Sequence, residues 1–210
     1  MGDTFIVVGA GQAGLQICDS VRKEGFNGEL ILIGDEKLPP YQRPPLSKQF
    51  LLGELTLERL PFRPNNFFEK NSISLKLASL VDGIDLENKT VSIGSQQLQY
   101  DKLAIATGTR VRKLPILGGD MDGVHYLRTA EDALRIKGDL QNAHSLIAIG
   151  GGFIGLEIAA VAKKLGLSVT VIEAQGRLME RVVSETVSEY FAELHRDHGV
   201  EILLASSVAK

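Results

Sequence analysis

The sequence contains one cysteine, Cys18, among its 210 residues. A single thiol excludes a disulfide within the chain, and such sparse use of cysteine is typical of a reducing compartment. No apolar run reaches the roughly 18 residues that a membrane-spanning helix needs. The chain also enters a strand-like segment at residues 4–8, without the basic and apolar regions of a secretory signal. We therefore expect a cytoplasmic protein that makes no membrane contact.

An excess of positive charge is also lacking. The 23 Lys and Arg residues against 26 Asp and Glu residues give a formal net charge of -3. Proteins dedicated to nucleic-acid binding are usually strongly basic, so we expect no nucleic-acid partner. Hydrophobic residues make up 44% of the chain and charged residues 23%, which is ordinary for a globular protein with a sizeable core.

Two stretches about 140 residues apart share one pattern of strand, glycine turn, helix and strand. In the first, "TFIVV" leads into "GAGQAG" at residues 9–14, a helical pattern and the strand "GELILIGD". In the second, "HSLIAIGGGFIGLEIAAVAKKLG" is followed by "LSVTVIEA". A repeat at this distance indicates a domain duplication. The expected fold class is α/β, with two Rossmann-like dinucleotide-binding folds.

The segments outside the two copies carry weaker signals. Residues 38–48 are rich in proline and predict an ordered loop. Alternation of apolar and polar residues from about Leu75 to Val91 predicts antiparallel strands, and residues 100–108 predict a buried strand. A helix capped by Thr129 is expected next. A late helix at residues 184–199 is expected to present one apolar face: Val187, Tyr190, Phe191 and Leu194.

Each glycine of the two turns has a predicted role. Gly9 permits the tight turn out of the strand, Gly11 lets the backbone approach a pyrophosphate, and Gly14 lets the helix pack close to the sheet. The phosphates then lie at a helix N-terminus, where free N–H groups favour negative charge. The second turn provides the same set of glycines: Gly150, Gly152 and Gly155.

An acidic residue follows the second strand of each copy. These residues are Asp35 and Glu173, and each is suited to accept hydrogen bonds from the two hydroxyls of a ribose. Glycine-rich turns also occur in other α/β domains, but here the complete order of strand, turn, helix, strand and acid occurs twice. The sequence therefore predicts two dinucleotide sites.

Six motifs fall in an order seen in a known family: "GAGQAG", "YQRPPLSK", "YDKLAIATG", "LRTAEDA", "GGGFIGLE" and "VIEAQGRLMERV". Over essentially its whole length the chain resembles FAD-dependent ferredoxin reductases of the putidaredoxin-reductase type. These belong to the pyridine nucleotide-disulfide oxidoreductase superfamily. The resemblance implies FAD in the first site and NADH in the second. It also implies electron transfer to a 2Fe-2S ferredoxin that serves a monooxygenase or dioxygenase.

The resemblance further implies which residues contact each cofactor. For FAD these are Gly9, Gly11, Ala13, Gly14, Asp35, Arg43, Lys48, Val81, Thr107, Gly108 and Arg128. For NADH they are Gly150, Gly152, Ile154, Gly155, Glu157, Glu173 and Arg181.

Lys48 and Glu157 are the predicted catalytic residues. Lys48 resembles the family lysine beside the flavin, where its charge would stabilise the reduced, anionic ring. Glu157 resembles its ion-pair partner, which also helps to position the nicotinamide. The alternative for Lys48 is a solvated lysine, and the alternative for Glu157 is a solvent-facing helix residue. The alternative for Arg43 is a surface arginine. Arg177 and Arg181 are a counterargument, because arginines near the strand-end acid can hold the extra phosphate of NADPH. The resemblance implies that arginines here accompany NADH use, so the closer carboxylate of Glu173 decides for NADH.

Several residues are predicted to play no chemical role. One cysteine cannot supply the dithiol of the disulfide reductases, so Cys18 is expected to be a small core residue. His195 and His198 are expected to be solvated, and no metal site is predicted. Arg110, Arg112 and Lys113 could meet an acidic ferredoxin or form hydrated surface.

The expected domains are an FAD-binding part at residues 1–112, a connecting segment at 113–142 and an NAD-binding part at 143–210. Members of the resembling family are longer, so we expect both folds to be incomplete and this chain to lack full activity. Two other function classes remain open. One is a non-catalytic interaction protein of the apoptosis-inducing-factor type, and the other is an inert nucleotide-binding module.

Overall fold

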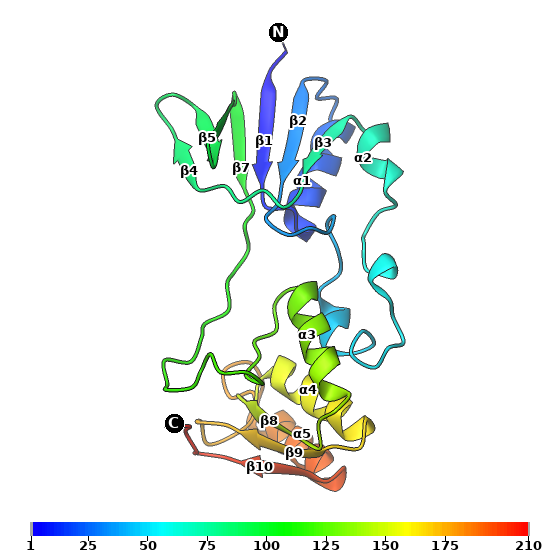
Figure 1. The fold of residues 1–210 in the computed structure, drawn as a ribbon, viewed down its shortest axis with the longest axis vertical. Coiled ribbons are helices and arrows are strands. Elements are labelled where there is room, and N and C mark those ends of the chain that lie inside the picture. Colours follow the sequence, from blue (N-terminus) through cyan, green and yellow to red (C-terminus); the bar gives the residue numbers. More distant parts are fainter. Residues whose placement is uncertain (1, 210) are drawn as a thin grey trace. The chain divides into compact units, whose positions relative to one another are not determined.

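The computed structural model describes residues 2–209, which divide into two units. One unit comprises residues 2–42 and 58–110, and the other comprises residues 43–57 and 111–209. Each unit is built on a parallel sheet of its own (Figure 1). The predicted α/β class with two parallel sheets is confirmed.

The first unit has a four-stranded parallel sheet in the order β3-β2-β1-β7. Ile6, Val7 and Leu32 are fully buried in it, as expected for β-branched and aliphatic runs covered on both faces. Val8 pairs with Ile33 on one side and Ile105 on the other, so three strands end at one edge. Its elements are β1 (Thr4–Val8), α1 (Gln12–Lys23), β2 (Glu29–Ile33), α2 (Asn66–Lys70), β3 (Ile73–Lys76) and β7 (Lys102–Ile105).

A small antiparallel sheet also belongs to this unit. It consists of β4 (Gly83–Asp85), β5 (Thr90–Ile93) and β6 (Gln96–Gln99). Ile84 pairs with Val91, which confirms the antiparallel prediction for this stretch. The prediction was wrong at its start, because Leu75 lies in β3 and pairs in parallel with Leu32. An edge strand of a parallel sheet also alternates when only one face packs on the core, so alternation alone could not separate the two cases.

The second unit has a three-stranded parallel sheet in the order β10-β9-β8. The strands are β8 (Ser145–Ile149), β9 (Ser168–Ile172) and β10 (Val200–Leu203). The helices are α3 (Ala130–Leu140), α4 (Phe153–Lys164), α5 (Glu185–Asp197) and a short 3₁₀ helix, η1 (Pro44–Ser47). A second 3₁₀ helix, η2 (Leu57–Arg59), lies where the chain passes from one unit to the other.

The duplication is visible in the backbone hydrogen bonds that lead out of each strand. The Gly9 N–H donates to the Ile33 carbonyl at 2.8 Å, and the Gly150 N–H donates to the Ile172 carbonyl at 2.7 Å. The two glycine turns therefore begin at equivalent positions.

The backbone hydrogen bonds just after the second strand of each fold also match. The Gly34 N–H donates to the Lys76 carbonyl, and the Glu173 N–H donates to the Leu203 carbonyl, both at 2.8 Å. The Gly34 carbonyl accepts from Ser79 just as the Glu173 carbonyl accepts from Ser206. Gly34 and Glu173 are therefore equivalent positions.

Helix α5 buries only part of the predicted face, in which Phe191 and Leu194 are half-buried. Val187 and Tyr190 are 40% and 60% exposed, whereas Ser188 and Ala192 are buried. The Ser188 hydroxyl donates to the Leu178 carbonyl at 2.5 Å. Small residues let the helix approach its neighbours closely, and the hydroxyl supplies a hydrogen bond that hydrophobic periodicity cannot reveal.

Among residues 2–209, no helix has both the length and the apolar character required to cross a bilayer.

Thr129 caps α3 as predicted, and we expect its removal to destabilise the second unit. Its hydroxyl accepts from the Asp132 N–H at 3.1 Å, while the Asp132 carboxylate accepts from the Thr129 N–H at 2.8 Å. Thr129→Ala should lower the free energy of unfolding by about 1 kcal/mol in urea denaturation followed by circular dichroism. Thr129→Ser keeps the hydroxyl and should stay near wild type. An equal loss in both variants would contradict this account of the cap.

Cys18 is predicted to be chemically inert in the folded protein. It is fully buried in the core with Leu15 and Leu30, and this burial raises the pKa of its thiol from 9.0 to about 12, against a smaller lowering effect of Arg22. The thiolate fraction at mildly alkaline pH is thus about a thousandfold lower than for a free thiol. A thiol reagent such as dithionitrobenzoate should label it only after denaturation. Rapid labelling of the native protein would contradict this.

Candidate functional site

The first glycine turn leaves no room for side chains at two of its three predicted positions. A Cβ on Gly14 would lie 2.0 Å from the Gly9 carbonyl oxygen, and one on Gly9 would lie 2.2 Å from the Ala106 carbonyl oxygen. Gly9 also has a φ of +115°, which side chains rarely tolerate. A Cβ on Gly11 would meet nothing within 4 Å. This open side at the start of α1 fits the predicted approach of a pyrophosphate.

The second glycine turn repeats this arrangement at the start of α4. Gly150 has a φ of +106°, and a Cβ on Gly155 would lie 2.1 Å from the Gly150 carbonyl oxygen. A Cβ on Gly152 would meet nothing within 4 Å. Both folds therefore combine a closely packed helix with an open glycine at the helix start, where the first N–H groups have no partner within the helix.

The other predicted FAD residues of the first unit gather at the carboxyl edge of its parallel sheet. Asp35 is exposed just after β2, and Thr107 and Gly108 are exposed just after β7. Ala13 is exposed in the first turn of α1. In open α/β sheets, ligands bind outside the carboxyl ends of the strands. Val81 differs, because it is half-buried against the core cluster beneath the antiparallel sheet.

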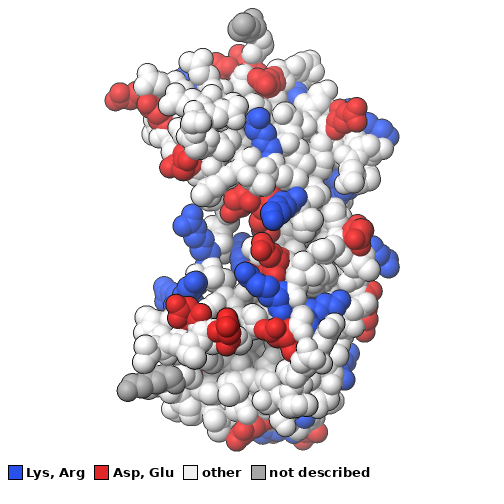
Figure 2. Space-filling view, viewed as in Figure 1, with Lys and Arg blue, Asp and Glu red and all other residues white. Residues whose placement is uncertain are grey.

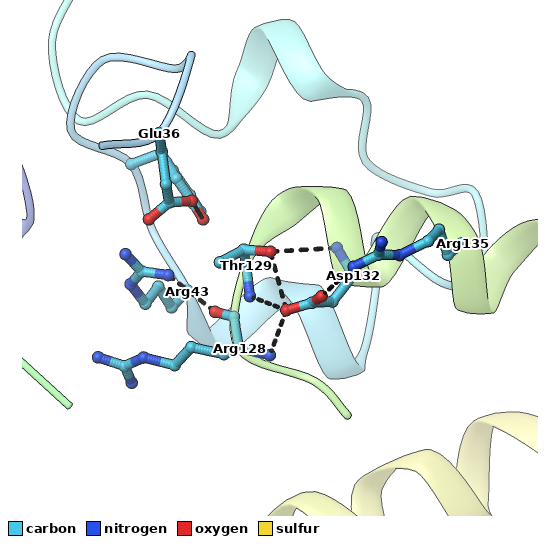
Figure 3. A network of polar contacts seen from close by, with 7 residues as sticks. Glu36, Arg43, Arg128, Thr129, Asp132 and Arg135 are labelled. Carbon is cyan, nitrogen blue, oxygen red and sulfur yellow. Dashed lines mark hydrogen bonds and ion pairs between the residues drawn. The ribbon is translucent and has the colours of Figure 1, made fainter. Parts of the chain in front are cut away.

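Arg43 and Arg128, both predicted to bind FAD, lie side by side within the second unit (Figure 3). The Arg43 guanidinium donates to the Arg128 carbonyl at 2.8 Å. The Arg128 N–H donates at 3.1 Å to the Asp132 carboxylate of the α3 cap, whereas the Arg128 guanidinium points away from this network (Figure 3). The α3 cap therefore fixes the backbone of Arg128, whose carbonyl accepts the hydrogen bond from Arg43.

Asp132 is held in its ionised form by this network. Burial disfavours its carboxylate, but hydrogen bonds from Thr129, Arg135 and Arg128 outweigh that effect and lower its pKa. A lowered pKa contributes stability above the unfolded-state value, and that contribution is lost as the pH falls through the folded-state value. The cap is therefore weakened only in acid.

Lys48 and Glu157 form the ion pair that the resemblance implied. The Lys48 Nζ lies 2.7 Å from the Glu157 Oε2, and the two side chains are 41% and 30% exposed. Such a half-exposed pair contributes about 0–1 kcal/mol to stability. Its value would therefore lie in chemistry rather than in folding.

Ser47 was missed by the sequence reasoning. Its buried hydroxyl donates to the same Glu157 oxygen that Lys48 approaches. Lys48 also donates to the Pro44 carbonyl at 3.0 Å, so both residues are set by the 3₁₀ helix η1. Its place next to Lys48 in "PPLSK" was the one available signal, because the predicted pairing of Lys48 with Glu157 already placed this segment against α4.

Glu173 is anchored by two backbone donors. Its Oε2 accepts from the Gly151 N–H at 2.6 Å, and its Oε1 accepts from the Gln175 N–H at 2.8 Å. Asp35 and Glu173 both lie just after the second strand of their fold, as predicted, but Gly34 is the position equivalent to Glu173, so the two acids are offset by one residue. The position equivalent to Asp35 is Ala174. Counting acids along a strand does not reveal where its last hydrogen bond lies.

The remaining predicted NADH residues lie in α4 and in the loop that contains Glu173. Ile154 is 53% exposed in the first turn of α4, and Arg181 is exposed in the loop after β9. Arg177 donates to the carbonyls of Glu180 and Val183 at 2.9 and 3.0 Å. The guanidinium of Arg177 is thus engaged within its own loop, which weakens the sequence argument for a phosphate there.

His195 was wrongly expected to be solvated. It is half-buried on α5, and its Nε2 has no hydrogen-bond partner. Burial, with a smaller effect of His198, lowers its pKa.

No group of three potential metal ligands occurs among residues 2–209. In Figure 2, acidic and basic residues are interspersed over the face that is shown, consistent with the net charge of -3.

Comparison with known proteins yields one family over nearly the whole chain. The family model described as "Pyridine nucleotide-disulphide oxidoreductase" matches residues 3–210. Rhodocoxin reductase of Rhodococcus erythropolis is 44% identical over 98% of this chain and 48% of its own. A ferredoxin–NAD(+) reductase component of the p-cumate 2,3-dioxygenase system of Pseudomonas putida is 42% identical over 94% of this chain and 49% of its own.

A solved structure agrees with these sequence relatives. The crystal structure of a ferredoxin reductase from Rhodopseudomonas palustris superposes with a TM-score of 0.96 at 37% identity, covering 99% of this chain and 52% of that one. The chain spans about half the length of the curated relatives it matches.

Proposed function

Because the chain belongs to the pyridine nucleotide-disulphide oxidoreductase family, we propose that it binds FAD through its first glycine turn and NADH through its second. The proposed reaction passes electrons from NADH through FAD to a 2Fe-2S ferredoxin, which in turn supplies a monooxygenase or dioxygenase. The observation that carries the proposal is the repeated turn. Each copy has an open glycine, Gly11 or Gly152, at the start of a closely packed helix.

The residues present fit both cofactors. Two pyrophosphates need two helix starts with room for close backbone approach, and both turns provide this. A bound flavin accepts a hydride as two electrons and can release them singly, as an iron–sulfur acceptor requires. We propose the cytoplasm as the location, because the chain has a single cysteine and that cysteine is buried.

The chain's own residues have distinct proposed roles. Lys48 provides positive charge for the reduced ring, and Glu157 holds Lys48 in place from 2.7 Å. Glu173 accepts hydrogen bonds from the ribose of NADH. We retain residues 1–112 and 143–210 as the proposed FAD-binding and NAD-binding parts, joined by residues 113–142. Residues 43–57, which include Lys48, group with the second unit.

The reaction is tested by spectroscopy on the purified protein, reconstituted with FAD under anaerobic conditions. NADH should bleach the flavin absorbance, and an added 2Fe-2S ferredoxin should then be reduced. A rubredoxin and a flavodoxin serve as acceptors of different chemistry. Failure to bind FAD would overturn the proposal, and retained NADH binding in that case would favour the inert nucleotide-binding module. Flavin reduction without transfer to the 2Fe-2S ferredoxin would overturn the electron-transfer part, whether or not rubredoxin or flavodoxin is reduced.

Lys48→Ala should slow flavin reduction by NADH at least about tenfold, because a positive charge that stabilises the reduced ring is removed. The dissociation constant for NADH should change much less, since Lys48 is proposed to act on the reduced product rather than on binding. Stopped-flow measurement separates the two constants. Lys164→Ala, which removes an exposed lysine from α4, is the matched control. An unchanged reduction rate in Lys48→Ala would remove this residue from the mechanism.

NADH should be preferred to NADPH by roughly tenfold to several hundredfold. Like charges about 4 Å apart cost roughly 1 kcal/mol in water and about 4 kcal/mol at an effective dielectric near 20. Glu173→Ala should narrow the preference chiefly by improving NADPH. Glu180→Ala removes an exposed acid from the same loop and should leave the preference unchanged. Equal dissociation constants of the wild-type protein for both cofactors would contradict the role of Glu173.

A further inference from the structure

Gly151, the middle glycine of the second turn, is bound by the loop that follows β9. This β9–α5 loop comprises residues 173–184. The Gly151 N–H donates to the Glu173 Oε2 at 2.6 Å, and the Gly151 carbonyl accepts from the Met179 N–H at 3.0 Å. Both polar backbone groups of one buried residue thus hold the loop against the turn.

No side chain fits at this position while the loop is docked. A Cβ on Gly151 would lie 2.5 Å from the Leu178 Cδ2 and 3.2 Å from the Glu173 Oε2. Leu178 is fully buried, and its carbonyl is held by the Ser188 hydroxyl at 2.5 Å. Because interiors are close-packed, a fully buried Leu178 has little free space into which its side chain could turn, so we expect a Cβ at position 151 to disturb the docking of the loop.

The first fold fills the same volume from the opposite side. Its turn carries Ala10 where the second turn has Gly151, and its strand end carries Gly34 where the second fold has Glu173. A Cβ on Gly34 would lie 2.5 Å from the Ala10 Cβ. In both copies, therefore, a side chain is present at only one of these two positions. The first fold places it on the turn, and the second places it at the strand end.

The β9–α5 loop is also stabilised from within. The Arg177 guanidinium binds the carbonyls of Glu180 and Val183, so its charge is used inside the loop. Both oxygens of Glu173 are held by backbone N–H groups, which orient the carboxylate without the neutralising effect of a cation. The two backbone donors therefore fix the direction of the carboxylate.

We propose that Gly151 is a positioning residue for the choice of nicotinamide cofactor. Because Gly151 has no side chain, the β9–α5 loop can pack against the glycine turn. This packing fixes the Glu173 carboxylate where the carboxylate accepts hydrogen bonds from the ribose hydroxyls of NADH and repels the 2′-phosphate of NADPH. This inference rests on the proposed function of the second fold.

The experiment measures dissociation constants of NADH and NADPH for the purified protein by fluorescence titration. Gly151→Ala should lower the ratio of the NADPH constant to the NADH constant at least about fivefold, since displacement of Glu173 weakens both its attraction for hydroxyls and its repulsion of phosphate. General loosening of the turn would weaken both cofactors equally and leave the ratio unchanged. An unchanged ratio in folded Gly151→Ala would overturn the inference.

Two further variants complete the test. Gly176→Ala adds the same methyl group to the same loop, where a Cβ meets nothing within 4 Å, and the ratio should stay at the wild-type value. Glu173→Asp keeps the charge but is one methylene shorter than the reach to the Gly151 N–H requires, so its ratio should fall as in Gly151→Ala. If Gly151→Ala does not fold, Glu173→Asp decides, and a wild-type ratio there overturns the inference.

Measurements on the wild-type protein distinguish failure of the Gly151 inference from failure of the proposed NADH-binding function. Binding of neither NADH nor NADPH would overturn both. A clear preference for NADH that survives Gly151→Ala and Glu173→Asp would leave the proposed function standing and overturn only the role of Gly151.

Discussion

The close approach of a helix to the strand before it is the constraint on which both folds depend. A Cβ on Gly14 or Gly155 would lie 2.0 or 2.1 Å from a carbonyl oxygen of the preceding turn, a distance that no packing adjustment of a side chain relieves. With these glycines in place, the helix N-terminus is brought to the carboxyl edge of each sheet. The open glycines Gly11 and Gly152 then present backbone N–H groups to the space in front of it.

Within this shared frame the two copies have diverged through small changes of volume. Ala10 with Gly34 in one copy, and Gly151 with Glu173 in the other, fill equivalent space from opposite sides. The change moves a carboxylate into the second turn and ties the β9–α5 loop to it. A duplicated scaffold can thus place a carboxylate against one glycine turn and not against the other without altering its strands or helices.

The periodic and glycine signals predicted most of the fold, because strands, the Thr129 cap and the tight turns are local features. The strand at residues 100–108 was wrongly expected to be buried, since Ile105 of β7 is 63% exposed. Contacts between distant segments were harder to predict. Ser47 against Glu157, the buried Ser188 on α5 and the half-buried His195 depend on which segments pack together. Leu75 was placed in the wrong kind of sheet because one-sided burial produces the same alternation in parallel and antiparallel edge strands. The one-residue offset between Asp35 and Glu173 could not be predicted, because only the hydrogen-bond register separates neighbouring positions.

We propose that one chain holds two separate dinucleotide sites, and the number of cofactors bound per chain tests this most directly. Equilibrium dialysis of the purified protein against FAD and NADH together should give one of each per chain, with neither displacing the other. Gly11→Val should reduce only FAD binding and Gly152→Val only NADH binding, because each valine fills the open side of one turn. Competition of FAD and NADH for a single site would contradict the account.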